Sequence, residues 1–197
     1  AIDYGAKVVA MCDSSGYIVD ENGIDLSIVK QIKEVERNRI KEYIARKEGA
    51  QYFECQKGIW TVKCDIALPC ATQNDINLDD AKILVENGTT VIGEGANMPC
   101  TNEAVKYFLE KGLLVAPAKA ANAGGVATSA LEMSQNSMRL SWTFEEVDEK
   151  LQIIMKNIFK VSKDAAENYG APGNYVIGAN IAGFLKVADA MVSQGIV

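Results

Sequence analysis

The feature that most constrains the fold is an alternation of short apolar segments with amphipathic stretches. The apolar segments have strand length and end in small or polar residues; they cover residues 6–12, 64–69, 90–93 and 113–117. The stretches between them carry apolar residues at helical spacing, over residues 26–47, 79–86 and 102–111. Strands that alternate with helices predict an α/β fold, with a doubly wound, mostly parallel sheet covered on both faces.

The pattern changes after residue 117, where no further strand is predicted. A glycine-rich turn at residues 122–125 precedes a helix to about residue 139, and helices follow over 143–169 and 177–194. Thr143 is a plausible N-cap, and the acidic residues in the turn after it suit the helix dipole. We therefore predict an α/β domain over residues 1–140 and a helical segment over 141–197.

Composition excludes several kinds of chemistry. The 197 residues include no histidine, which removes Ser-His-Asp and Cys-His nucleophile arrangements and histidine-containing zinc sites. The net charge is -6 and the basic residues form no block, so a nucleic-acid partner is not expected. No metal site is predicted.

Compartment and cysteine chemistry follow from the same composition. No apolar run approaches the roughly 20 residues that span a bilayer, so no membrane contact is predicted. The five cysteines form no CxxC pair, and we expect buried free thiols in a reducing cytosol. The predicted location is cytoplasmic.

Small and polar residues follow each predicted strand. Ligands of open α/β sheets bind at the carboxyl ends of the strands, so residues 12–16, 70–75, 93–99 and 119–125 are candidates for nucleotide contacts. These residue types are also favoured in ordinary turns. Four such segments in register favour a nucleotide site.

Asp13 stands where a Rossmann unit commonly binds the adenosine ribose 2'-hydroxyl. However, Ser14 and Ser15 follow it, and three basic residues lie on the next predicted helix, where they could meet a 2'-phosphate: Lys33, Arg37 and Arg39. The residues alone therefore leave NAD and NADP open.

Two further segments carry amides and glycines. Residues 93–98 match only part of a GxGxxG fingerprint, which is a weak signal, but Asn97 could bond a carboxamide or a ribose. Residues 122–129 place paired glycines at a helix start, where backbone N–H groups favour an anion such as a carboxylate. Ser129, one turn into that helix, could add a hydroxyl.

Five ungapped blocks in this sequence resemble the small hexameric glutamate dehydrogenases. They are PCATQN at 69–74, EGANMP at 94–99, KAANAGGV at 119–126, LEMSQN at 131–136 and GANIAGF at 178–184. The resemblance implies oxidative deamination of L-glutamate to 2-oxoglutarate and ammonia by a cytoplasmic homo-hexamer. Hydride would pass to NADP, with NAD as the alternative.

The resemblance also implies roles for individual residues. Asn97 and Asn122 would line the nicotinamide end of the cofactor site, and Ala71 and Thr72 would form a cofactor-contacting turn. Val126 and Ser129 would contact substrate, with Ser129 near the side-chain carboxylate of glutamate. Asp13, Ser14 and Ser15, with Arg39 nearby, resemble NADP-preferring members, although Cys12 stands where those members usually have serine.

The family's glycine fingerprint and its substrate domain, with the catalytic lysines and aspartate, have no counterpart in this sequence. The resemblance therefore implies a C-terminal fragment, with a partial dinucleotide-binding domain over residues 1–140 whose sheet lacks its first strand. Such a fragment would hold no catalytic residue and show no turnover alone. Its last helices would pack against the absent domain. The alternatives are a leucine or phenylalanine dehydrogenase, or a non-catalytic nucleotide-binding module.

Overall fold

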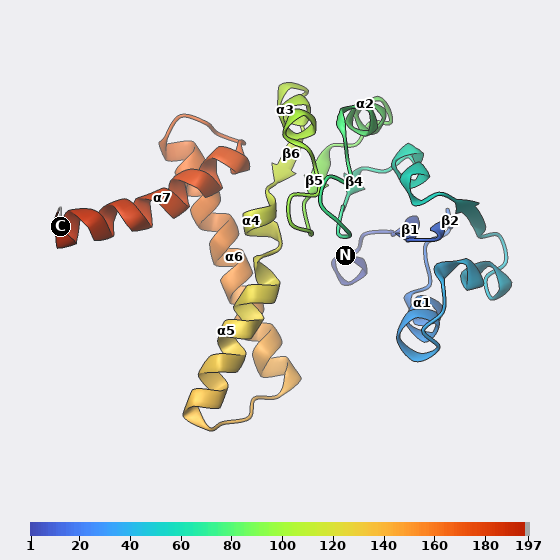
Figure 1. Ribbon diagram of the computed structural model, residues 1–197, viewed down its shortest axis with the longest axis horizontal. Helices are drawn as coiled ribbons and strands as arrows, with labels where there is room; N and C mark the ends of the chain where they lie inside the picture. Colours follow the sequence, from blue (N-terminus) through green and yellow to red (C-terminus); the bar gives the residue numbers. More distant parts are fainter. Residues whose placement is uncertain (196–197) are drawn as a thin grey trace. The chain divides into compact units, whose positions relative to one another are not determined.

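The computed structural model describes residues 1–195, so the last two residues of the predicted segment 141–197 lie outside it (Figure 1). The described chain forms two compact units. Unit 1 comprises residues 1–65 and 82–89, and unit 2 comprises residues 66–81 and 90–195. Helices and strands occur together in both units, which confirms the α/β class.

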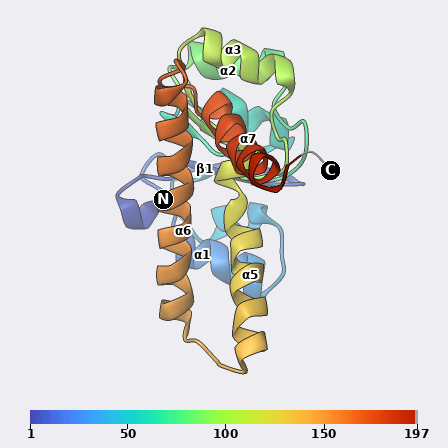
Figure 2. The same cartoon turned by 90° about the vertical axis from the view of Figure 1, so that its left-hand side faces the viewer.

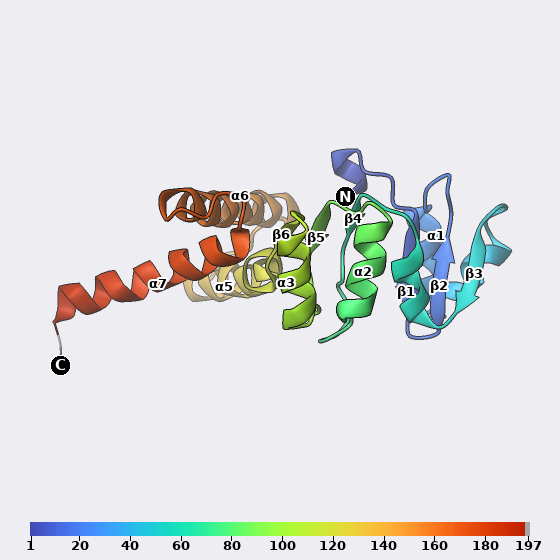
Figure 3. The same cartoon turned by 90° about the horizontal axis from the view of Figure 1, so that it is seen from above.

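Unit 1 is built on an antiparallel sheet of three strands in the order β1-β2-β3 (Figure 3). These strands are β1 (Ala10–Asp13), β2 (Gly16–Val19) and β3 (Gln51–Glu54), with the 3-10 turns η1 (Ile2–Tyr4) and η4 (Gln56–Thr61) before and after them. Tyr17 and Phe53 are directly opposed on neighbouring strands, and their rings stack at 5.0 Å. Such cross-strand pairs stabilise antiparallel sheets.

Unit 1 departs from the sequence prediction in two ways. The predicted strand at 6–12 corresponds to β1, but β1 pairs antiparallel with β2, and neither β2 nor β3 was predicted. The approach of β3 to β2 depends on Gly16, because a Cβ there would lie 2.2 Å from the Phe53 carbonyl oxygen.

The predicted continuous helix over 26–47 is also wrong. It is divided into α1 (Leu26–Lys30), a π-helical turn η2 (Gln31–Val35) and a 3-10 helix η3 (Ile40–Ala45). Arg37 adopts a positive φ of 55° and Arg39 is extended, which interrupts the helix between η2 and η3. The apolar spacing still serves its purpose, because Ile32, Ile40 and Tyr43 remain in one buried cluster with Ile18.

Unit 2 contains the parallel sheet that the sequence predicted, in the order β4-β5-β6. The strands are β4 (Ile66–Ala67), β5 (Val91–Gly93) and β6 (Leu114–Ala116), all parallel. Helix α2 (Leu78–Glu86) follows β4 and is crossed by the unit boundary, and α3 (Asn102–Glu110) connects β5 to β6. The central residues Ile92 and Val115 are fully buried, as expected for a parallel sheet covered by helices.

Four helices complete unit 2: α4 (Ala118–Ala121), α5 (Ala123–Met138), α6 (Phe144–Asn168) and α7 (Tyr175–Gln194). Helices α5 and α6 lie side by side, and α7 packs on α6 (Figure 2). Helix α7 also contacts β6. The predicted cap of α6 is confirmed, since Thr143 and Glu146 form a reciprocal capping box. Gly178 allows the close approach of α7 to α6, because a Cβ there would lie 2.0 Å from the Ser162 carbonyl oxygen.

Helix α7 corrects the prediction that no segment approaches the length and apolarity of a membrane span. Within the described residues it is the one helix long and apolar enough to cross a membrane, with a mean hydropathy of 1.4. Isolated polar residues, including Asn180, Lys186 and Asp189, interrupt its sequence, so it contains no long unbroken apolar run. Length and composition alone do not place it in a membrane, because core helices of soluble proteins meet the same criterion.

Candidate functional site

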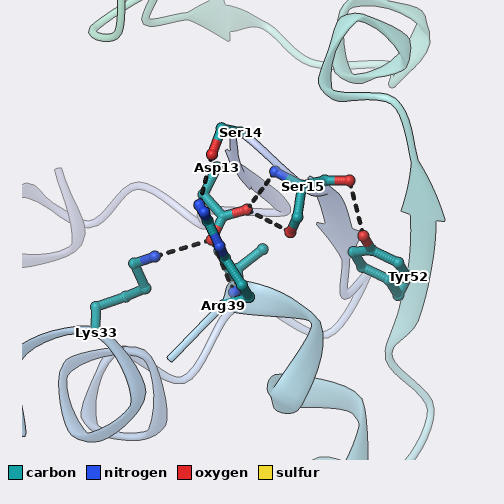
Figure 4. Close-up of polar contacts among 7 residues, drawn as sticks. Asp13, Ser14, Ser15, Lys33, Arg39 and Tyr52 are labelled. Carbon is teal, nitrogen blue, oxygen red and sulfur yellow. Dashed lines mark hydrogen bonds and ion pairs between the residues drawn. The ribbon is translucent and has the colours of Figure 1, made fainter. Parts of the chain in front are cut away.

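The first group of candidate residues surrounds the carboxylate of Asp13, at the β1–β2 turn of unit 1 (Figure 4). One oxygen accepts hydrogen bonds from the backbone N–H and the hydroxyl of Ser15, at 2.9 and 2.6 Å. The other accepts from Lys33 Nζ at 2.8 Å and from the backbone N–H of Ile40 at 2.9 Å. Asp13 therefore joins the turn to η2 and η3, the segments that follow α1.

These contacts determine the charge of Asp13. Partial burial opposes its ionisation, but the hydrogen bonds from Lys33, Ser15 and the Ile40 backbone outweigh burial and hold the pKa of the Asp13 carboxyl far below its usual range. The side chain is thus a carboxylate with four internal donors. It is occupied as a link within unit 1, which leaves it poorly placed to accept a hydrogen bond from a ribose.

Ser14 and Arg39 lie on the exposed side of this link. The Arg39 guanidinium donates to the Ser14 hydroxyl at 2.5 Å, and both side chains are exposed to solvent. Asp13 carries one negative charge, whereas Lys33 and Arg39 each carry one positive charge. The first group therefore has one positive charge in excess. An exposed hydroxyl beside a guanidinium suits a phosphate. The Tyr52 hydroxyl donates to the carbonyl oxygen of Ser15 at 2.9 Å. The structure thus brings together the four candidates of this group, which are Asp13, Ser14, Ser15 and Arg39.

The second group lies in unit 2, where the turns after β5 and β6 meet. Asn97 lies in the turn after β5, and Asn122 lies between α4 and α5. Asn122 Nδ2 donates to Asn97 Oδ1 at 2.6 Å. This contact uses one donor and one acceptor, which leaves Asn97 Nδ2 and Asn122 Oδ1 able to bond a ligand that offers both, such as a carboxamide.

The glycines of residues 93–98 serve the packing of strand ends. A Cβ at Gly93 would lie 2.8 Å from Leu68, and a Cβ at Gly95 would lie 2.4 Å from the sulfur of Cys70. Gly95 also donates its backbone N–H to the Pro69 carbonyl at 3.1 Å. The partial fingerprint therefore reflects close contact between the segments after β4 and β5.

The remaining candidates of unit 2 are exposed. Ala71 and Thr72 lie in the turn after β4, while Val126 and Ser129 lie on α5. Val126 is 71% exposed, and the Ser129 hydroxyl donates to the Gly125 carbonyl one turn earlier at 3.3 Å. Gly124 and Gly125 are themselves helical, so the predicted glycine turn is the first turn of α5.

Glu94 was not predicted from the sequence as part of the site. It is a buried carboxylate at the end of β5 that accepts hydrogen bonds from the backbone of two other segments. Its signal in the sequence is a charged residue between the two glycines at 93 and 95.

The prediction of buried cysteines holds for Cys100 but is wrong for Cys55 and Cys70, which are exposed. None of the five cysteines forms a disulfide within the described residues.

Burial of Cys100 also affects its chemistry. Burial, and then the negative charge of neighbouring Glu94, raise the pKa of the Cys100 thiol far above its usual range. A thiol with a raised pKa stays protonated, and the protonated form is a poor nucleophile. Cys100 therefore behaves as a small core residue.

Comparison with known proteins adds three findings. A family model described as Glutamate/Leucine/Phenylalanine/Valine dehydrogenase matches residues 1–195. Among curated proteins, the chain is 55% identical to a glutamate dehydrogenase of Bacteroides thetaiotaomicron and 52% identical to an NADP-specific glutamate dehydrogenase of Haemophilus influenzae. Both matches cover the whole chain but 44% of the relative, so the chain spans less than half the length of these proteins.

A solved structure gives the same result for the fold. The chain superposes on Plasmodium falciparum glutamate dehydrogenase with a TM-score of 0.92 at 46% identity, over 100% of this chain and 43% of that one.

Proposed function

Because the chain belongs to the glutamate/leucine/phenylalanine/valine dehydrogenase family, we propose that a protein containing it catalyses the NAD(P)-dependent oxidation of L-glutamate to 2-oxoglutarate and ammonia. The observation that carries the choice of glutamate is the identity of 55% and 52%, over the whole chain, to two proteins named for that amino acid. The chain would supply most of a Rossmann-like nucleotide-binding domain and the helical segment after it.

NADP is the cofactor that the first group of residues fits best. Asp13 has four internal donors, whereas Ser14 and Arg39 are exposed and the group carries one excess positive charge. A 2'-phosphate would receive hydrogen bonds from Ser14 and Arg39 and a favourable field from the excess positive charge of the group. NAD is the alternative, since the 2'-hydroxyl could still bond Ser14 or Ser15.

The second group would receive the nicotinamide end. The bound nicotinamide would accept the hydride that leaves the α-carbon of glutamate. The free donor of Asn97 and the free acceptor of Asn122 match the carboxamide or ribose hydroxyls. Ala71 and Thr72 lie in the turn after β4, whose residues Pro69 and Asn74 bond the backbone on either side of Asn97. On α5, Val126 and Ser129 would contact the substrate, and the Ser129 hydroxyl would turn from the Gly125 carbonyl to donate to the substrate's side-chain carboxylate.

The chemical step needs groups that the family resemblance places elsewhere in the longer protein, namely lysines and an aspartate. The chain of 197 residues alone is therefore proposed to lack turnover. We also propose that the whole protein assembles as a homo-oligomer, because the exposed faces of α5, α6 and α7 carry many large apolar side chains, among them Met133, Ile153 and Phe184.

Steady-state oxidation of four amino acids by the full-length protein tests this proposal. Glutamate, leucine, phenylalanine and valine would each be assayed with NADP+ and with NAD+, and the 197-residue chain would be assayed in parallel. We expect the highest kcat/KM with glutamate and no turnover by the chain alone. A higher kcat/KM with leucine, phenylalanine or valine would contradict the assignment.

A further inference from the structure

Glu94 is a buried carboxylate whose two oxygens contact two different segments of unit 2. Its side chain follows β5, and the residue is only 5% exposed. One oxygen accepts the backbone N–H of Cys100 at 3.3 Å, and the other accepts the backbone N–H of Ala118 at 2.9 Å. Glu94 thus connects the turn after β5 to the first residue of α4.

A buried carboxylate is unfavourable unless hydrogen bonds compensate the loss of water. An apolar side chain could fill the same space without that penalty, so what distinguishes Glu94 is the pair of backbone groups it holds. One belongs to the segment just before α3, and the other to the segment just after β6. Neither contact can be made by an apolar side chain.

The two connected segments carry the two amides of the candidate site. Asn97 lies in the turn between Glu94 and Cys100. The hydrogen bond from the Cys100 N–H to the Glu94 carboxylate joins the two ends of this turn. Asn122 follows the single turn of α4, whose first residue is held by the other oxygen. Glu94 therefore holds one backbone position in each of the two segments whose amides meet at 2.6 Å.

We infer that Glu94 is a positioning residue, which sets the separation of Asn97 and Asn122 so that their remaining donor and acceptor can bind the nicotinamide end of the cofactor. This inference rests on the proposed function. Glu94 itself touches no cofactor atom in this account and acts only through the two amides.

A double-mutant cycle in the full-length protein tests the inference. The variants are E94Q, N97A and the double variant, with E103Q as a matched control because Glu103 is an exposed glutamate in the first turn of α3. The dissociation constant for NADPH would be measured by fluorescence titration, and hydrogen exchange would be followed in peptides covering residues 95–100 and 117–122.

We expect E94Q to weaken NADPH binding about tenfold, since losing one well-placed hydrogen bond to the ligand costs a factor of about this size. The double variant should bind about as weakly as N97A alone, because the role of Glu94 passes through the amides. Exchange should be faster in at least one of the two peptides of E94Q, because glutamine keeps only one acceptor oxygen, and unchanged in both peptides of E103Q. A wild-type dissociation constant for E94Q, or losses that multiply in the double variant, would overturn the inference.

A second variant covers the case in which E94Q does not fold. A118P removes the N–H that Glu94 accepts, and proline is tolerated at the first position of a helix. It should weaken NADPH binding as E94Q does, and unchanged binding would again overturn the inference. Failure of the full-length protein to oxidise glutamate would refute the proposed function, whereas the NADPH titrations decide the role of Glu94 independently.

Discussion

Replacing Asp13 by asparagine should destabilise unit 1, because the carboxylate accepts four hydrogen bonds. An amide keeps one oxygen, so whichever way it faces, its NH2 meets two of the four donors. If the NH2 faces Lys33 and Ile40, loss of the ion pair with the partly exposed Lys33 lowers the unfolding free energy by about 0.5–1 kcal/mol. The bond from the buried backbone of Ile40 to a charged group is worth about 1.5–3 kcal/mol. The expected loss in this orientation is about 2–4 kcal/mol.

The loss should also depend on pH. The folded-state pKa of Asp13 lies below its unfolded value of about 3.9, so the stability that the carboxylate contributes is present above pH 4 and is lost as pH falls below it. The difference between wild type and D13N should therefore be constant from pH 7 to about pH 5 and smaller at pH 3.

Urea unfolding of the chain measures this difference. Trp60 is buried in unit 1 and Trp142 is the other tryptophan, so a W142F background leaves Trp60 as the reporter. E36Q serves as a control, because Glu36 pairs with Arg46 at a more exposed position and should matter less. An unfolding free energy for D13N within about 0.5 kcal/mol of wild type, the usual range for surface substitutions, would refute the reasoning, as would a difference that does not shrink at pH 3.

Three further predictions concern other residues. R39A should raise the KM for NADP+ about tenfold and leave the KM for NAD+ nearly unchanged in steady-state assays of the full-length protein, because the proposed charge-assisted bond to the 2'-phosphate would be lost; an equal rise for both would contradict this. G178A should destabilise the chain by about 1–3 kcal/mol in thermal unfolding through its clash with the Ser162 carbonyl, whereas G183A, with open space around it, should not. Iodoacetamide should label exposed Cys70 well before buried Cys100, as followed by mass spectrometry; equal rates would count against the assigned burial.

The parallel strands and most helices of unit 2 were predictable from the sequence because their signals are local. Strands β5 and β6 are short apolar segments between polar turns, and Thr143 with Glu146 forms a capping box that a few residues specify. Strand β3 was missed because its sequence, Gln-Tyr-Phe-Glu, is half polar and mostly exposed, so it gives no apolar signal.

The break between η2 and η3 could not be predicted because its cause is not local. The Ile40 N–H binds Asp13, which is 27 residues earlier in the sequence, and periodicity carries no information about such a contact. In the candidate site, too, local features were predictable from the sequence and contacts between distant residues were not. Strand-end position identified Asn97 and Asn122 separately, but their contact across 25 residues, and the burial of Glu94 between their segments, depend on the packing of the sheet.

The most direct test of the account is the ratio of kcat/KM for NADP+ to kcat/KM for NAD+, measured with L-glutamate on the full-length protein. The positive group around Ser14 and Arg39 predicts a ratio above about 10, since one charge-assisted contact to a phosphate is worth at least a factor of that size. A ratio below 1, or no oxidation of glutamate with either nucleotide, would contradict the account.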